Sequence, residues 1–169
     1  MKNFKSYMKI KTLKPTFFKD KRGDYWTTWK KNYFKKLDFN HDKFSISKKN
    51  VLRGFHVDFK SWKMVTCIYG KVILYVVNFD KKSNQYLSKK KFILNDKNKK
   101  IVLIPPNYAN AHLCVSKKCV FHYKFSYKGN YPDVVKQMSI KWNDPKLKIK
   151  WPIKKPTLSH RDKNSKPIK

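Results

Sequence analysis

The chain has 169 residues, a length typical of one domain, and we expect a single domain spanning residues 1–169. Hydrophobic residues make up 40% and aromatic residues 16%, which excludes a disordered basic tail because such tails have too little apolar surface to fold. The net charge is +32, and the longest apolar run, Val72 to Val77, is too short for a membrane-spanning helix.

Short runs rich in Val, Ile, Tyr and Phe recur along the chain, separated by turn residues such as Gly70 and the Pro105-Pro106-Asn107 segment. Such runs at short intervals indicate an all-β sandwich or barrel. Helical periodicity is weak, so short helices are expected only at residues 28–37 and 133–138. From Trp142 onward, recurring prolines favour an extended strap over the surface. The predicted strands are residues 7–13, 51–57, 62–69, 71–79, 87–94, 100–104, 111–116 and 119–127.

The positive charge by itself suits a nucleic acid or an anionic membrane surface as partner. Nucleic-acid-binding proteins are usually rich in Arg, which forms bidentate hydrogen bonds with phosphates and bases. Here Arg occurs only at Arg22, Arg53 and Arg161. Lys is spread over nearly every segment, together with Asn, Ile, Phe and Tyr, as AT-rich coding tends to produce. We therefore interpret most of the charge as a solvated surface. A basic β-barrel that binds nucleic acid remains the alternative outside the enzymes.

The cysteines and histidines provide no metal-binding pattern. Cys67, Cys114 and Cys119 form no Cys-x-x-Cys pair and are interpreted as reduced core thiols of a cytoplasmic protein. His56 is followed by Val57-Asp58 but by no second His at the spacing of a metal-binding barrel. The N-terminus has no apolar core of a secretory signal. We expect no bound metal and no membrane association.

One motif carries a family resemblance. Leu52-Arg53-Gly54-Phe55-His56 is an Arg-Gly-apolar-His step, and it is preceded by Asp20-x-Arg22-Gly23. Further matches follow in register, namely Lys63-Met64-Val65, Gly70-Lys71-Val72, Ile104-Pro105-Pro106, Tyr123-Lys124, Trp142-Asn143-Asp144-Pro145, Trp151-Pro152, and Leu158-Ser159 with Asp162. Together they resemble the nucleotide-sugar 3,5-epimerases of the dTDP-4-dehydrorhamnose 3,5-epimerase family, over about residues 17–167. The closest resemblance is to a subgroup acting on GDP-4-keto-6-deoxy-heptoses in bacterial capsule synthesis, which shares the 41–44, 65–67 and 106–112 stretches.

The resemblance implies a cupin fold (a double-stranded β-helix or jelly-roll barrel), a homodimer, a nucleotide-diphosphate sugar as substrate, and neither metal nor organic cofactor. A 4-keto group acidifies the hydrogens on C3 and C5. A base removes one of these protons to give an enolate, and an acid on the opposite face returns a proton, so the configuration inverts. Inversion at C3 alone, or keto-isomerisation, remains open. So does a sugar-binding cupin that has lost catalysis.

The resemblance also assigns roles to individual residues. His56 matches the base, which suits an imidazole that titrates near neutral pH, and Asp162 matches its carboxylate partner. Tyr123 matches the acid, with Tyr127 and Tyr131 as rivals. Lys63 matches the cation beside the keto oxygen. Arg22 and Arg53 match positions that hold the sugar and the diphosphate.

The sequence departs from the wider family at substrate-contact positions. A Gln-x-Asn stretch is replaced by His41-Asp42-Lys43, and the barrel-loop Ala-His-Gly becomes Asn110-Ala111-His112. The Glu that usually follows the first Arg-Gly is absent, with Trp26-Thr27 near its place. We therefore interpret four residues as candidates for substrate specificity, and His122 and His160 as structural or exposed. The four are His41, Lys43, Asn110 and His112.

Overall fold

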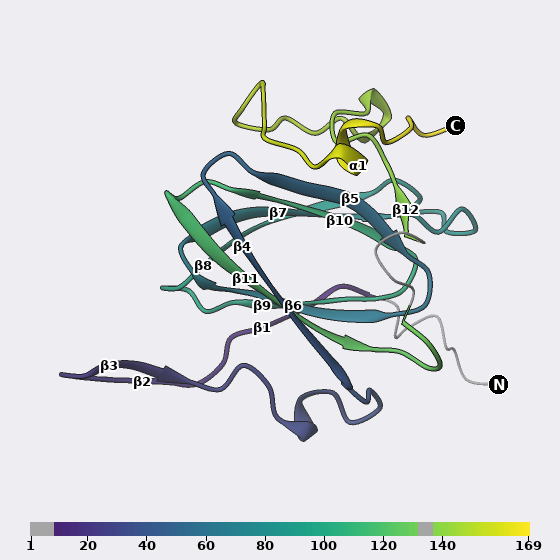
Figure 1. Ribbon diagram of the computed structural model, residues 1–169. Helices are drawn as coiled ribbons and strands as arrows, with labels where there is room; N and C mark the ends of the chain where they lie inside the picture. Colours follow the sequence, from purple (N-terminus) through teal and green to yellow (C-terminus); the bar gives the residue numbers. More distant parts are fainter. Residues whose placement is uncertain (1–8, 132–136) are drawn as a thin grey trace.

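The computed structural model describes residues 9–131 and 137–169, which form two facing five-stranded sheets (Figure 1). The first sheet has the order β1-β9-β6-β11-β4 and the second β12-β5-β10-β7-β8, with antiparallel pairing throughout. The strands of the first sheet are β1 (Lys11–Leu13), β9 (Ile101–Ile104), β6 (Trp62–Tyr69), β11 (Lys118–Ser126) and β4 (His41–Lys48). Those of the second are β12 (Met138–Ser139), β5 (Leu52–Asp58), β10 (Tyr108–Cys114), β7 (Lys71–Asn78) and β8 (Lys89–Asn95).

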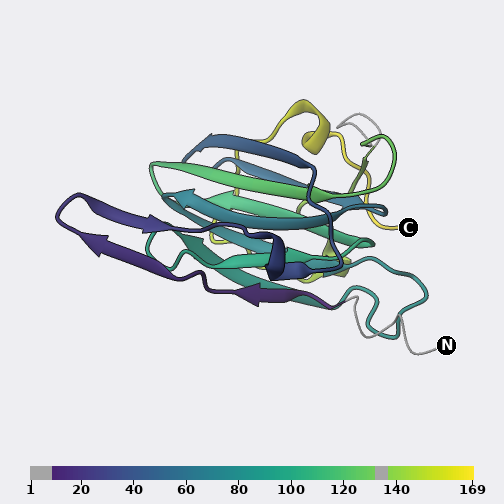
Figure 2. The same ribbon diagram turned by 90° about the horizontal axis from the view of Figure 1, so that it is seen from below.

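A separate two-stranded hairpin, β2 (Phe17–Asp20) with β3 (Gly23–Trp26), projects away from the two sheets, as Figures 1 and 2 both show. Its apolar side chains are largely exposed: Phe17 by 52%, Phe18 by 66% and Tyr25 by 72%. The chain then makes one 3-10 turn, η2 (Lys31–Phe34), before it enters β4. Most of the apolar surface of the hairpin is therefore not packed against the rest of the same chain.

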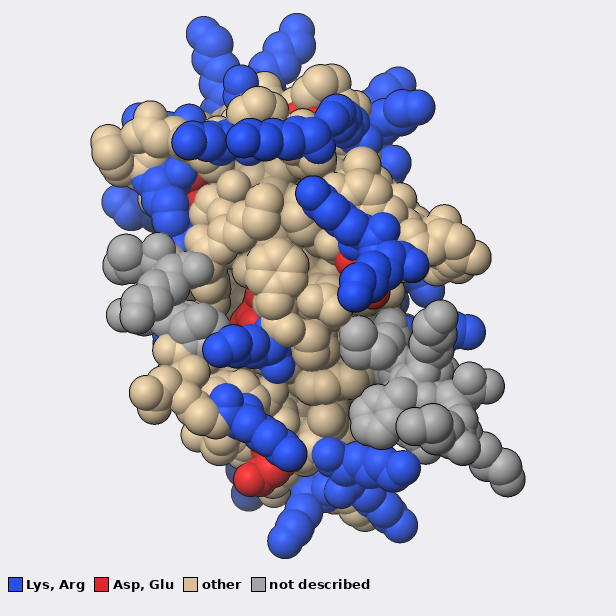
Figure 3. All heavy atoms as spheres, turned by 90° about the vertical axis from the view of Figure 1, so that its right-hand side faces the viewer, with Lys and Arg blue, Asp and Glu red and all other residues tan. Residues whose placement is uncertain are grey.

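Charged side chains are distributed over the surface. On the face shown in Figure 3, Lys and Arg lie along the upper and lower borders and in separate groups between them, with few carboxylates among them. This distribution agrees with a broadly solvated basic surface.

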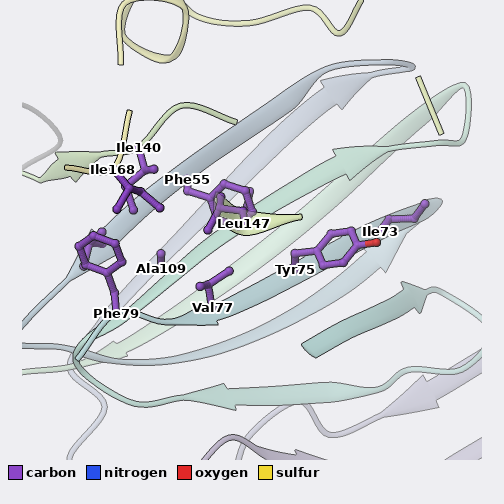
Figure 4. Packing of buried hydrophobic residues seen from close by; sticks show 11 residues of the cluster. Phe55, Ile73, Tyr75, Val77, Phe79, Ala109, Ile140, Leu147 and Ile168 are labelled. Atoms are coloured by element: carbon purple, nitrogen blue, oxygen red, sulfur yellow. The ribbon is translucent and has the colours of Figure 1, made fainter. Parts of the chain in front are cut away.

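Both faces of the second sheet are buried, and β7 shows why. Val72, Leu74 and Val76 point into the space between the sheets, where they join the interior core. Ile73, Tyr75 and Val77 point to the opposite face, because successive side chains of a strand alternate. That face is covered by residues of the C-terminal third, including Ile140, Leu147 and Ile168, which lie over the sheet in Figure 4. The sequence of a strand that is buried on both faces is a continuous apolar run, as in β7.

The C-terminal segment crosses the second sheet as an extended strap. Asp144 secures it, since its Oδ2 accepts a hydrogen bond of 2.6 Å from the backbone N–H of Ile168. Within the strap are a 3-10 turn, η4 (Pro145–Leu147), and one helical turn, α1 (His160–Lys163), which contacts β5. The side chain of Ser159 caps α1 by accepting from the N–H of Asp162 at 3.2 Å. In the described part of the chain, no helix is long and apolar enough to span a membrane.

The predicted all-β fold is confirmed, and the strap also lies where the prolines indicate. The strand predicted from residue 111 begins earlier, at Tyr108. Residues 7 and 8 of the predicted 7–13 strand lie outside the described residues, and within 9–13 the strand spans Lys11–Leu13. The helix expected at 28–37 is wrong, because only the η2 turn forms there. The 133–138 helix lies mostly outside the described residues, and its last residue, Met138, begins β12.

The sequence prediction missed β4 and the hairpin. In β4 the apolar residues Phe44 and Ile46 alternate with polar ones, but they point to solvent, with exposures of 64% and 60%. Their polar neighbours point inward instead. The strand therefore lacks the buried apolar face by which strands are recognised.

Candidate active site

A cavity of about 430 Å³ lies between the two sheets and is lined by residues of β4, β5, β6, β10, β11 and α1. It gathers seven of the ten predicted site residues: Lys43, Arg53, His56, Lys63, Asn110, Tyr123 and Asp162. The cavity therefore brings together side chains that are up to about a hundred residues apart in sequence, such as the 106-residue separation of His56 and Asp162.

Gly54 sets the position of the residues around it in β5. Its φ is +120°, and a Cβ there would lie 2.5 Å from the carbonyl oxygen of Asn110 and 2.7 Å from the Cβ of Ala111. Only glycine allows this close approach of β5 to β10. The Arg-Gly-apolar-His step thus places Arg53 and His56 on a backbone held tightly against β10.

His56 and Asp162 form a hydrogen-bonded pair, with 2.7 Å between Nε2 and Oδ1. Asp162 is only 3% exposed, and its Oδ2 accepts from the N–H of Gly54 at 3.3 Å. Burial opposes ionisation of Asp162, but the hydrogen bonds from His56 and Gly54 prevail and hold its pKa below the usual value. A carboxylate facing Nε2 fixes the imidazole proton there, which leaves Nδ1 as the basic nitrogen.

The surroundings of His56 keep the ring neutral. Burial lowers its pKa below 6.5, the charge of Asp162 opposes this shift, and the cations of Arg161 and Lys63 add to it. Arg161 lies directly against His56, with Nη2 in contact with Nε2. A neutral imidazole near pH 7 is the form that can take a proton.

Tyr123 reaches the cavity from β11, in the sheet opposite His56. Its hydroxyl lies 3.2 Å from Nδ1 of His112. Burial raises the pKa of Tyr123 above its usual value, so the phenol keeps its proton at neutral pH. The cavity is therefore flanked by a neutral imidazole on one sheet and a protonated phenol on the other.

Lys63 supplies a buried cation to the same cavity. Its Nζ donates to Oδ1 of Asn110 at 3.0 Å and lies 3.8 Å from Oδ2 of Asp58. Burial lowers the pKa of Lys63 to about 8, with Asp58 opposing the shift. Lys63 is thus mostly protonated at neutral pH and can stabilise negative charge that develops on a bound oxygen.

Two further cations line the cavity. Arg53 donates from Nε to Oγ of Ser47 at 3.0 Å and from Nη2 to the carbonyl of Ile46 at 3.2 Å. Lys43 lies over the ring of Tyr131, with 4.3 Å from Nζ to the ring centroid. Both positions suit an anionic substrate group.

Three predicted residues are not brought to the cavity surface. Arg22 lies at the turn of the projecting hairpin, where it pairs with Asp20 at 2.6 Å and its side chain is 85% exposed. His41 bonds the hydroxyl of Tyr127 at 3.1 Å, beside Tyr131. His112 is completely buried behind Tyr123.

The remaining histidines lie where the sequence interpretation puts them. His122 pairs with Asp42 at 2.6 Å and stacks on Phe44, and His160 is exposed on α1. All three cysteines are buried and unpaired, as expected of core thiols. Within residues 9–131 and 137–169, no group of three His, Cys, Asp or Glu side chains is arranged for a metal ion.

Sequence reasoning missed Arg161 and Ser159 as cavity residues. The scarcity of Arg singles out Arg161, but nothing local places it beside His56. Ser159 precedes Asp162 by three residues, the spacing of a helix cap, and this spacing could have predicted the turn that orients the carboxylate.

The fold and the cavity define a class of protein: a two-sheet barrel whose cavity gathers side chains suited to acid–base chemistry from both sheets. A family model described as dTDP-4-dehydrorhamnose 3,5-epimerase matches residues 7–169. The chain belongs to this family of sugar-nucleotide epimerases.

Individual relatives agree with the assignment. The dTDP-4-dehydrorhamnose 3,5-epimerase of Salmonella typhimurium is 33% identical over 159 residues, which cover 89% of this chain and 85% of that protein. The dTDP-6-deoxy-D-glucose-3,5-epimerase of Legionella pneumophila, solved in complex with dTDP-4-keto-L-rhamnose, is 28% identical with a TM-score of 0.86, covering 94% of this chain and 87% of that one. The predicted cupin barrel is thereby confirmed.

A more distant structure shares only the fold. A 3′-monoepimerase from Streptomyces bikiniensis, in complex with dTDP-quinovose, is 22% identical with a TM-score of 0.85, covering 94% of this chain and 83% of that one. The same barrel therefore occurs in enzymes named for one epimerisation and in enzymes named for two.

Proposed function

We propose that this protein inverts C3 and C5 of a dTDP-linked 4-keto-6-deoxyhexose. The observation that carries the proposal is the placement of His56, with Asp162 behind it, and Tyr123 on opposite sheets of one cavity. Inversion at a carbon needs a base on one face of the sugar and an acid on the other. A protein that only binds a sugar has no need for this separation.

The reaction follows from the groups in place. Nδ1 of His56 takes the proton from the carbon next to the keto group, and the electron pair moves to the keto oxygen as an enolate. Lys63 stabilises that oxygen, a contribution typically of about 10²–10³ in rate. Tyr123 then protonates the carbon from the other side. His56 loses its extra proton to solvent and the phenolate regains one, so the enzyme is restored without net change.

The choice of a dTDP sugar is supported by the family and by the relatives described above, which are named for dTDP substrates. The preference for a GDP-4-keto-6-deoxy-heptose, expected from the 41–44 and 106–112 stretches, finds no support among these relatives and stays a prediction. Lys43 and Arg53 both line the cavity, and these two cations support binding of the diphosphate of either nucleotide.

The test is proton exchange followed by NMR in D₂O. The protein is mixed separately with dTDP-4-keto-6-deoxyglucose and with a GDP-4-keto-6-deoxy-heptose. Deuterium at both C3 and C5 of the dTDP sugar supports the proposal, and faster exchange into the heptose would move the substrate to the GDP series. Deuterium at C3 alone would mean a monoepimerase or a keto-isomerase. No exchange with either would contradict the proposal and favour the nucleic-acid-binding alternative, whose affinity would fall steeply with salt.

Tyr123→Phe separates the two carbons, with Tyr127→Phe as the matched control. Tyr127 loses the same single hydroxyl, but it does not line the cavity. Tyr123→Phe should abolish inversion at each carbon that depends on the acid, although His56 can still exchange hydrogen with solvent, while Tyr127→Phe keeps inversion at both carbons. Unchanged inversion at C3 and C5 in Tyr123→Phe would contradict the role of Tyr123 as the acid.

The active form is a homodimer of this single domain. The hairpin exposes Phe17, Phe18 and Tyr25, and β4 exposes Phe44 and Ile46; together they form an apolar surface that a second copy would cover. Arg22 is exposed at the turn of this hairpin, away from its own cavity, and we propose that in the dimer it reaches the cavity of the partner copy. Light scattering would show the mass of two chains, and Arg22→Ala would raise KM.

We place the reaction in the cytoplasm, in the synthesis of a bacterial surface polysaccharide.

A further inference from the structure

His112 has no role in the reaction described so far. It is 0% exposed, lies in β10, and its ring stacks on Phe121 with 4.2 Å between centroids and 15° between planes. Nδ1 lies 3.2 Å from the hydroxyl of Tyr123, whereas Nε2 is buried without a hydrogen-bond partner among the described residues. A phenylalanine would keep the stacking and leave no polar atom unsatisfied, so packing does not explain a histidine here.

The unsatisfied Nε2 indicates which nitrogen carries the proton. A buried N–H without an acceptor is rarer than a buried acceptor without a donor, so the bare nitrogen is Nε2 and the proton is on Nδ1. Burial, together with the charges of Arg53 and His56, lowers the pKa of His112 to about 3, so the ring is neutral at neutral pH. In this tautomer Nδ1–H donates to the phenolic oxygen of Tyr123.

We infer that His112 is a positioning residue for the acid Tyr123: it directs the phenolic proton toward the cavity and stabilises the phenolate left after proton transfer. The inference rests on the proposed function. The phenolic O–H bond breaks as the new C–H bond forms, and the negative charge stays on the Tyr123 oxygen. His112 keeps its own proton throughout and shortens its hydrogen bond to the oxygen, because hydrogen bonds to charged groups are stronger. It touches no substrate atom.

The first experiment is His112→Phe, assayed by NMR as conversion of dTDP-4-keto-6-deoxyglucose to its inverted product. The hydrogen bond matters most after charge develops, so kcat should fall by about 10- to 100-fold with little change in KM. Stability should rise, because the unsatisfied nitrogen is gone, with Tm higher by about 2–4 °C. Cys114→Ala, on the same strand and in the same interior core, should leave kcat unchanged. An unchanged kcat in His112→Phe, or a loss of kcat that follows a loss of Tm, would overturn the inference.

The double variant Tyr123→Phe/His112→Phe tests whether His112 acts through Tyr123. The residual rate of inversion should equal that of Tyr123→Phe alone, because His112 then has no phenolic oxygen to bind. Multiplicative losses in the double variant would show that His112 contributes independently of Tyr123.

A measurement that needs no activity separates this inference from the proposed function. Imidazole nitrogen NMR of the wild type should show His112 neutral, with Nδ1 protonated and Nε2 bare, and Tyr123→Phe should shift the Nδ1 signal. A protonated Nε2, or a signal insensitive to Tyr123→Phe, would overturn the pairing whether or not the enzyme acts on a dTDP sugar. The expected spectrum together with no exchange in the wild type would contradict the proposed function alone.

Discussion

Asp162→Asn tests the base directly. The amide keeps the shape of the carboxylate and an oxygen that can accept from Gly54, but it carries no charge. His56 is neutral before it takes the proton and positive afterwards, so the charge of Asp162 stabilises mainly the second state. The substitution should therefore slow the chemical step more than it weakens substrate binding.

The size of the effect follows from the geometry. The pair is 2.7 Å apart, and the side chains of His56 and Asp162 are only 20% and 3% exposed, so solvent screens it little. A hydrogen bond to a charged group in such a site contributes about 1.5–3 kcal/mol. Asp162→Asn should therefore lower kcat by about 10- to 150-fold.

The pH dependence gives a second readout with a defined sign. The rate rises with pH as His56 loses its proton, and this acid limb lies below pH 6.5 because the pKa of His56 is lowered. Without the carboxylate, burial and the cations of Arg161 and Lys63 act unopposed, so the limb should move to lower pH. The measurement is kcat/KM by deuterium incorporation between about pH 5 and 9.

Asp144→Asn is the matched control, because Asp144 is equally buried at 3% exposure but holds the strap through Ile168. It should lower Tm and leave kcat and the acid limb unchanged. If Asp162→Asn lowers kcat by less than about threefold and leaves the acid limb in place, His56 does not depend on Asp162 and the assignment of the base fails.

Three other outcomes are expected. Lys63→Met should lower kcat by about 10²–10³, and the wild-type rate should fall above pH 8 as Lys63, with its pKa of about 8, loses its charge; a wild-type rate that stays flat to higher pH would contradict this. Gly70→Ala should lower the free energy of unfolding by at least about 2 kcal/mol in a denaturant titration, because φ is +79° and a Cβ would collide with the carbonyl of Lys118; unchanged stability would refute the strain. Increasing salt should lower kcat/KM, because the charge of +32 steers a diphosphate inward, and a profile independent of salt would exclude steering.

The fold was largely predictable because its core strands carry strong local signals. The run from Val72 to Val77 is apolar on both faces, and turn residues mark its ends. The edge strand β4 and the projecting hairpin were not predictable, because Phe44, Phe18 and Tyr25 face solvent within one chain. The apolar residues of these elements lie on an exposed surface and not in the core of the chain.

The site was predictable only in part. The Arg53–His56 step and Tyr123 could be proposed as site residues because residue types and order carry the family motif, and the structure places them in one cavity. The contact of Arg161 with His56 and the position of His112 behind Tyr123 depend on how the strap and the two sheets meet, and no local spacing encodes either. His112 is an example. Its sequence position predicts a substrate contact, but in the structure it is buried behind Tyr123.

The proposed base His56 and the proposed acid Tyr123 need opposite protonation states at rest, and burial favours both. Burial disfavours charge, so it lowers the pKa of His56 and raises that of Tyr123, which keeps the imidazole unprotonated and the phenol protonated at the same pH. During turnover both groups become charged, and burial disfavours these charged forms. Asp162 contacts His56 and His112 contacts Tyr123, so each group has one partner that stabilises its charged form. Loss of either partner should therefore slow turnover while leaving the resting protonation states unchanged at neutral pH.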